Sequence, residues 1–172
     1  MAGPMEIDVW QGDLAELEVD ALVVSAMESL FMTAGPAAAV KRRGGAESER
    51  AAVDQGPVAA GSAVVTHAGA LAASYVIHVV AVGHDRVADP ERLNAALRAA
   101  LAAAGPLQLR RIAVALVGVE SGVFDVQEAA HLLVSALRST DAALEAVVIA
   151  TTSRAETEAV HAALTSTPTT AA

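Results

Sequence analysis

Two glycine-bearing loops are the segments of this chain best suited to bind an anion. The first runs through Ala34-Gly35-Pro36 into an expected helix that contains Ala37, and the second runs from Gly118 to Phe124 into another expected helix. Free backbone N–H groups and the positive end of a helix dipole favour phosphate at such positions. Glycine between a strand and a helix is more often plain turn chemistry, so the spacing alone indicates a phosphate site only weakly.

Two glutamates offer a different chemistry. Glu28 lies before the first glycine loop and Glu120 lies within the second, so both could face one crevice from opposite loops. Paired carboxylates can position or activate a water molecule for hydrolysis. Glutamates in loops are more often simply solvated, and both interpretations stay open at this point.

Metal and cofactor chemistry has little support in the sequence. There is no cysteine, and the five histidines are scattered without the spacing of metal ligands. His84-Asp85 resembles a dyad, but its position after a strand indicates a surface turn. We therefore expect no metal and no cofactor.

Composition narrows the classes of partner. The 172 residues carry a net charge of -9, and the only basic run is Lys41-Arg42-Arg43, so a nucleic-acid duplex is not an expected partner. No apolar stretch reaches the roughly 18 residues that a membrane helix needs. The start, Met1-Ala2-Gly3-Pro4, has no signal-peptide pattern, and we expect a cytoplasmic protein without membrane association.

Strands and helices alternate along the chain, which indicates an α/β sheet with helices on both faces. No linker divides it, so we expect one domain over residues 5–165 and a disordered tail at 166–172. In such sheets, ligands bind beyond the carboxyl ends of strands, where both glycine loops lie. The expected strands are 5–10, 20–25, 62–66, 74–82, 111–117 and 144–150. The expected helices are 37–43, 47–55, 89–104, 154–164 and one that begins at 125 or 126 and ends at 138.

The order of short motifs closely resembles the macro-domain family over about residues 6–164. This resemblance implies a three-layer α/β/α sandwich with a mixed, mostly parallel central sheet. It is carried by Gln11-Gly12-Asp13-Leu14, the run from Val19 to Ala26, the run from Ala34 to Val40, Gly61 to Thr66, Ser74-Tyr75-Val76-Ile77-His78 and Ser121-Gly122-Val123-Phe124.

The resemblance also implies site residues. Asp13, beside Leu14, matches the aspartate that holds the adenine amino group, although it could simply shape the turn after Gly12. Phe124 matches an aromatic residue that often covers the ribose, or it is a core residue. The two phosphate loops map to Ala34, Gly35 and Ala37, and to Ser121, Gly122 and Val123.

Several residues depart from the family pattern. Ser25 stands for the first of two paired asparagines, and Met27 or Glu28 stands for the second, which contacts the distal ribose and supports hydrolysis in some members. Pro36 has no N–H to offer a phosphate. No aromatic residue follows the last strand at 150–152, where the family often stacks one on adenine.

These observations predict a binding module for ADP-ribose or a related nucleotide diphosphate, with an ADP-ribosylated protein as a wider partner. Two alternatives remain. One is an ADP-ribosyl hydrolase that acts on modified proteins or on an acetylated ADP-ribose, with Glu28 or Glu120 as the catalytic group. The other is a degenerate macro fold that serves protein–protein contact.

Overall fold

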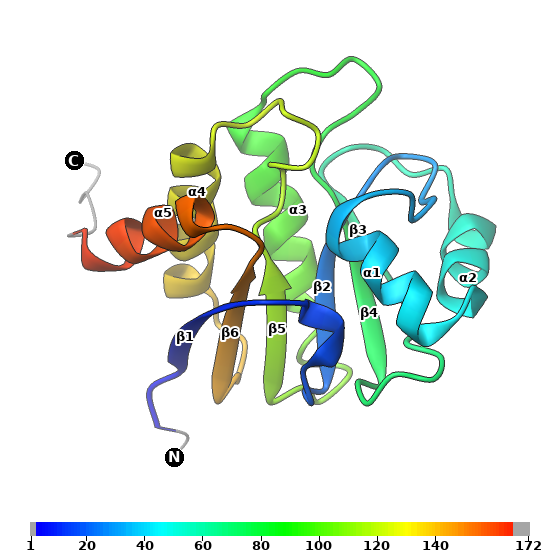
Figure 1. Cartoon of the computed structure of the whole chain (residues 1–172), viewed down its shortest axis with the longest axis horizontal. Coiled ribbons are helices and arrows are strands. Elements are labelled where there is room, and N and C mark those ends of the chain that lie inside the picture. Colours follow the sequence, from blue (N-terminus) through cyan, green and yellow to red (C-terminus); the bar gives the residue numbers. More distant parts are fainter. Residues whose placement is uncertain (1–2, 167–172) are drawn as a thin grey trace.

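A six-stranded sheet, in the order β1-β6-β5-β2-β4-β3, forms the centre of the computed structural model, which describes residues 3–166 (Figure 1). All neighbouring strands are parallel except β3 and β4, which are antiparallel. The sheet is therefore mixed and mostly parallel, as the sequence predicts. The strands are β1 (Glu6–Gln11), β2 (Ala21–Ala26), β3 (Ser62–His67), β4 (Tyr75–Val80), β5 (Arg111–Ala115) and β6 (Ala146–Thr151).

Helices cover both faces of the sheet and confirm the three-layer α/β/α sandwich. One face packs against α3, α4 and α5, and the other packs against α1, α2 and a short 3-10 helix, η1. The helices are η1 (Leu14–Glu16), α1 (Gly35–Gly44), α2 (Glu47–Gln55), α3 (Pro90–Ala102), α4 (Val126–Ser139) and α5 (Arg154–Thr165).

The central strand β2 explains why the two outer layers are both well packed. Its apolar residues 21–24 are all fully buried, and alternate side chains point to opposite faces. Ala21 and Val23 join the core under α3 to α5, while Leu22 and Val24 join the core under α1. A continuous apolar run is typical of a parallel strand that is covered on both faces.

The predicted helices and strands match the structure to within a few residues at their ends. The exception is η1, which the sequence does not reveal because three residues are too few for a periodic pattern. Asp13 caps it by accepting a hydrogen bond from the N–H of Ala15. Most of the predicted tail, residues 167–172, lies outside the described residues, and no helix within 3–166 is long and apolar enough to cross a membrane.

A histidine and a threonine form a buried polar pair within the sheet. His78 on β4 is fully buried, with its Nε2 atom 2.9 Å from the hydroxyl oxygen of Thr66 on β3. Its Nδ1 atom has no hydrogen-bond partner. Burial lowers the pKa of His78 to about 4, because the charged imidazolium would lose its hydration there.

We predict that acid destabilises this fold through His78. An unfolded histidine has a pKa near 6.5, so between about pH 6.5 and pH 4 the unfolded chain binds a proton that the folded chain excludes. The free energy of unfolding should fall over this interval by on the order of 3 kcal/mol. Urea unfolding at pH 7.5 and pH 4.5 measures the loss. A His78→Leu, Thr66→Val double variant should lose less over the same interval, and an equal loss would contradict the assignment.

Candidate functional site

Three loops meet at one edge of the sheet, because β2 lies between β4 and β5. They follow the carboxyl ends of these strands and cover residues 27–34, 81–89 and 116–125, in blue, green and yellow at the upper edge of Figure 1. Two cavities open among them and beside η1. This edge is where open α/β sheets bind ligands.

Ser25 holds two of these loops together. Pairing between β2 and β5 ends at Val23 and Val114, and the strands diverge beyond this point. There the Ser25 hydroxyl oxygen accepts a hydrogen bond from the N–H of Gly118, with 3.1 Å between the two atoms. The residue that replaces the family's first asparagine thus links the end of β2 to the second glycine loop.

The first cavity, here the Glu28 cavity, has a volume of about 420 Å³, within the range of roughly 300–1,000 Å³ for small-molecule sites. Two large apolar side chains in its wall, Met27 and Phe31, are 48% and 50% exposed. Its charged or titratable wall residues are Glu28, Glu120, His84 and Arg86, and its other wall residues are Ser25, Ala26, Thr33, Ala34, Ala37, Ala81, Val82, Gly83, Gly118 and Ser121.

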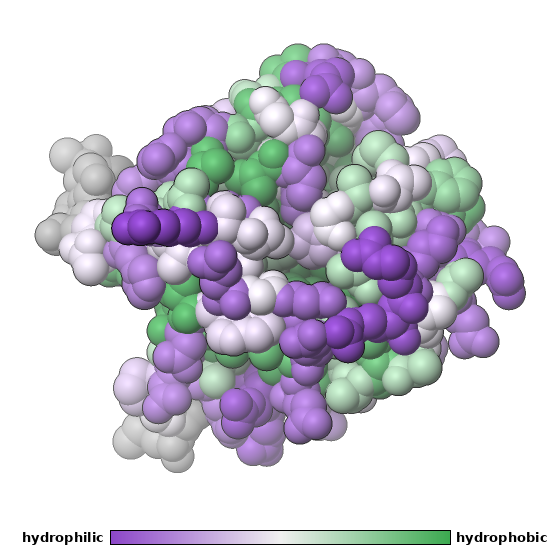
Figure 2. Space-filling model, in the orientation of Figure 1, coloured by the Kyte–Doolittle hydropathy of each residue, from purple (hydrophilic) through white to green (hydrophobic). Residues whose placement is uncertain are grey.

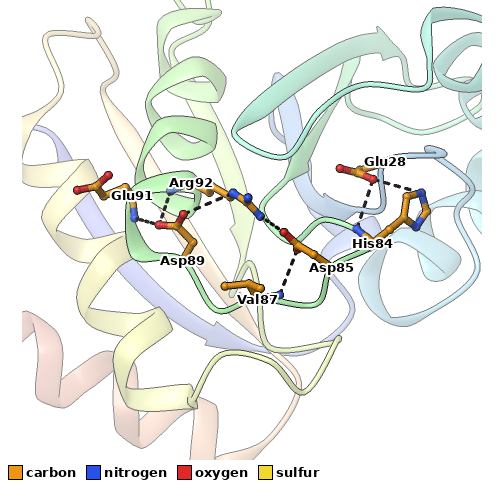
Figure 3. Close-up of polar contacts among 7 residues, drawn as sticks. All are labelled: Glu28, His84, Asp85, Val87, Asp89, Glu91 and Arg92. Carbon is orange, nitrogen blue, oxygen red and sulfur yellow. Dashed lines mark hydrogen bonds and ion pairs between the residues drawn. The ribbon is translucent and has the colours of Figure 1, made fainter.

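Glu28 contacts the loop that follows β4. One carboxylate oxygen lies 3.2 Å from Nε2 of His84 and accepts a hydrogen bond from the backbone N–H of the same residue at 3.3 Å (Figure 3). Sequence reasoning interpreted His84-Asp85 as a surface turn, and the His84 side chain is indeed 76% exposed. The structure nevertheless places it in the cavity wall.

The same loop is tied to the start of α3. Arg92 lies 2.7 Å from a carboxylate oxygen of Asp85 and 3.4 Å from one of Asp89, the N-cap of α3 (Figure 3). The hydrogen bond from Arg92 is the main reason that the pKa of Asp85 is lowered. The loop between β4 and α3 is therefore held near its middle, at His84 and Asp85, and at its end, at Asp89.

Arg86 is a wall residue that sequence reasoning missed. Its guanidinium group donates a hydrogen bond to the carbonyl oxygen of Ser121 at 2.8 Å, which joins the loop after β4 to the second glycine loop. A single arginine in a loop gives no periodic or motif signal. Only the strand order brings it to this edge.

The second cavity, here the Asp13 cavity, has a volume of about 450 Å³. Leu14 forms part of its buried wall, while Gly35 belongs to its rim from the start of α1. A Cβ atom at Gly12 would lie 2.4 Å from the far edge of the Trp10 ring, so a larger residue there would require that ring to move. The cavity is lined by Gln11, Gly12, Asp13, Leu14, Gly35, Pro36, Ala39, Arg42, Ala150 and Thr152.

Asp13 has structural partners in addition to its place in this wall. One carboxylate oxygen caps η1, and the other lies 3.0 Å from Nε of Arg43, which also contacts Glu16. The turn-shaping role is thus present in the structure. A carboxylate has about four acceptor positions, so these two contacts leave capacity for a ligand amine.

Only part of the second glycine loop lines a cavity. Ser121 lines the Glu28 cavity, whereas Gly122, Val123 and Phe124 line neither cavity. The N–H groups of Gly122 and Val123 already donate within the loop, to the carbonyl oxygen of Val119 and the hydroxyl of Ser121. A phosphate bound there would have to replace these bonds.

Phe124 lies in the core of this structure. It is 3% exposed, and its ring contacts the position of Gly118, where a Cβ atom would lie 3.0 Å away. The same core contains Leu93 of α3. Of the two roles considered for Phe124, this position fits the packing role.

The first glycine loop contributes to both cavities. Ala34, the N-cap of α1, and the buried Ala37 line the Glu28 cavity, while Gly35 lines the Asp13 cavity. Gly35 has a φ of +57°, which favours glycine, and a Cβ atom there would lie 2.9 Å from Cγ of Glu120. The two glycine loops therefore touch where the cavities adjoin.

Glu120 lies at this contact, and the pKa of its carboxyl group is shifted. Burial raises its pKa above the usual range, while a hydrogen bond from the Ser25 hydroxyl acts in the opposite direction. Glu120 as a whole residue is nevertheless exposed to solvent. Figure 2 shows polar and apolar residues intermixed on the face in view, rather than one continuous apolar patch.

Comparison with known proteins matches residues 23–133 to the Macro domain family. An uncharacterised Mycobacterium tuberculosis protein is 37% identical over 134 residues, which cover 78% of this chain. The match spans only 37% of that longer relative. An uncharacterised Pyrobaculum aerophilum protein is 36% identical over 152 residues, with 84% of this chain and 81% of that protein covered.

Solved structures share the fold. A Trypanosoma brucei macrodomain in complex with ADP-ribose has a TM-score of 0.84 at 21% identity, and the match covers 92% of this chain and 69% of that one. An Oceanobacillus iheyensis macrodomain with ADP has a TM-score of 0.81 at 19% identity, covering 95% and 94%. The family match over most of the chain, together with this strand order and these two loops, establishes that the chain belongs to the macro domain family.

Proposed function

We propose that this chain binds ADP-ribose or a related nucleotide diphosphate. The observation that carries the proposal is the pair of cavities that adjoin where Gly35 meets Glu120. A ligand with two bulky ends and an anionic linker matches this arrangement. Macrodomain structures with ADP and with ADP-ribose support the same class of ligand.

Each cavity is lined by residues that suit one end of the ligand. In the Asp13 cavity the carboxylate would accept a hydrogen bond from the adenine amino group, beside Leu14. The distal ribose would occupy the Glu28 cavity, next to Met27. The linker would lie along the N-terminus of α1, where the helix dipole favours negative charge.

The wider biological setting follows from the same proposal. An ADP-ribosylated protein is the macromolecular partner that such a site would recognise, rather than a nucleic-acid duplex or a membrane. The net charge of -9 agrees with this choice, because a duplex-binding surface would need several basic residues. We place the protein in the cytoplasm and treat residues 5–165 as one ligand-binding domain.

Calorimetric titration with ADP-ribose, with AMP and NAD as controls, tests the proposal directly. We predict that Asp13→Ala weakens ADP-ribose binding by roughly tenfold or more, because a hydrogen bond to a charged group contributes about 1.5–3 kcal/mol. Arg43→Ala is the matched control: it removes the ion pair of Asp13 but leaves the carboxylate in place. Equal losses in both variants would mean that Asp13 acts through local structure and does not hold adenine.

We further predict that Gly122→Glu abolishes the rise in melting temperature that ADP-ribose causes. The substitution adds volume and a negative charge to the loop beside the phosphate linker. Gly122→Ala is the control, because both variants carry the backbone strain of a φ of +70° but alanine adds little volume and no charge. A full ligand-induced shift in Gly122→Glu would exclude this loop from phosphate binding.

Hydrolysis is the second candidate function, and one observation favours it. Glu28 and Glu120 line the same cavity from opposite loops, as a pair of carboxylates that positions water would. Met27 weighs against it, because a thioether is at best a poor acceptor where the family places an asparagine.

We predict that the chain removes ADP-ribose from a modified protein weakly or not at all. Orientation of the reacting groups supplies several kcal/mol of a barrier, and each 1.36 kcal/mol lost costs about tenfold in rate. The assay compares the unmodified chain with Met27→Asn and Glu28→Gln. A gain confined to Met27→Asn supports a module that has lost its chemistry. Rapid release by the unmodified chain, abolished in Glu28→Gln, would make Glu28 a catalytic residue instead.

A further inference from the structure

The two cavities are separated by one side chain. Gly35 lines the Asp13 cavity and Glu120 lines the Glu28 cavity. A Cβ atom on Gly35 would lie 2.9 Å from Cγ, 3.8 Å from Cβ and 3.9 Å from Cδ of Glu120. The Glu120 side chain thus lies along the backbone at the start of α1, at the boundary that a ligand spanning both cavities must cross.

No cationic side chain among the described residues offsets the negative charge of Glu120. Glu156 on α5 and Glu28 in the same cavity wall are further carboxylates in its surroundings. The two basic side chains in the wall of the Glu28 cavity are engaged elsewhere, since Arg86 donates to the Ser121 carbonyl oxygen and His84 lies against Glu28. Within residues 3–166, Glu120 forms no ion pair.

Ser25 and Glu120 both line the Glu28 cavity, and the Ser25 hydroxyl oxygen accepts a hydrogen bond from the N–H of Gly118, in the loop that carries Glu120. The group that the end of β2 presents in this wall is therefore a neutral hydroxyl and not a cation. A diphosphate brought to the boundary meets the volume and the like charge of the Glu120 side chain, and both disfavour its binding.

We propose that Glu120 is a selectivity residue that disfavours ligands whose anionic linker joins the two cavities, and leaves ligands confined to the Asp13 cavity unaffected. The proposal rests on the proposed nucleotide site and assigns the role to one side chain. A diphosphate displaces the Glu120 carboxylate when it binds. Adenosine, which has no phosphate and occupies one cavity, leaves the carboxylate where it is.

The test compares ADP-ribose and adenosine on the full chain and three variants, by calorimetry for the first ligand and by an NMR titration for the second. Glu120→Gln removes the charge and keeps the shape, and Glu120→Ala removes both. Glu47→Gln, an exposed glutamate on α2, makes the same change in net charge away from the site. Melting curves without ligand establish that each variant is folded.

We expect ADP-ribose to bind about tenfold more tightly or better to Glu120→Gln and to Glu120→Ala. Adenosine should bind all four chains equally, and Glu47→Gln should match the unmodified chain. An equal gain in Glu47→Gln would overturn the proposal in favour of a long-range charge effect. Weaker binding in the Glu120 variants would overturn it by making Glu120 a ligand contact.

Failure of this inference is distinguishable from failure of the proposed function. Unchanged ADP-ribose affinity in both Glu120 variants, with a loss in Asp13→Ala, overturns the selectivity role and leaves the nucleotide site standing. If neither ligand binds any of the four chains, both proposals are wrong. Binding of ADP-ribose that is detectable only after Glu120 is replaced supports the selectivity role in its strongest form.

Discussion

The position of β2 between β4 and β5 is the constraint on which the site depends. The pairing of β2 with β5 ends at Val23 and Val114, three residues before β2 itself ends. Beyond that point the strands no longer share a ladder, and the space between them is bridged by the hydrogen bond from Gly118 to Ser25. Both glycine loops start from this opening. A different neighbour for β2 would separate residues that now share one cavity.

The loops around the opening are positioned mainly by polar contacts between them. Glu28 contacts His84, Arg86 reaches the Ser121 carbonyl, and Asp85 is joined to α3 through Arg92. Exposed ion pairs contribute only about 0–1 kcal/mol each, so they add little to the stability of the domain. Their effect is geometric, since two of them join one loop to another and the third joins a loop to α3.

Electrostatics gives this site an unusual character for an anion-binding fold. The chain is acidic overall, and two of its cationic side chains near the cavities are already engaged: Arg86 with a carbonyl and Arg43 with Asp13. Arg42 lines the Asp13 cavity and has no ion pair within the described part of the chain. Attraction for a diphosphate would therefore come from Arg42 together with the helix dipole and backbone N–H groups, against the charge of Glu120.

The sequence by itself determined the elements and their order, because apolar periodicity and glycine or proline boundaries are local signals. The buried run in β2, the Asp89-Pro90 start of α3 and the macro-domain motifs all required only neighbouring residues to interpret. The positions of the two glycine loops could be predicted for the same reason. Only the tertiary structure decided which side chains contact one another around those loops. Phe124 lies in the core, Arg86 and His84 line the Glu28 cavity, and Glu120 lies against Gly35. Each of these contacts joins segments that are far apart in the chain, and only the strand order brings such segments together.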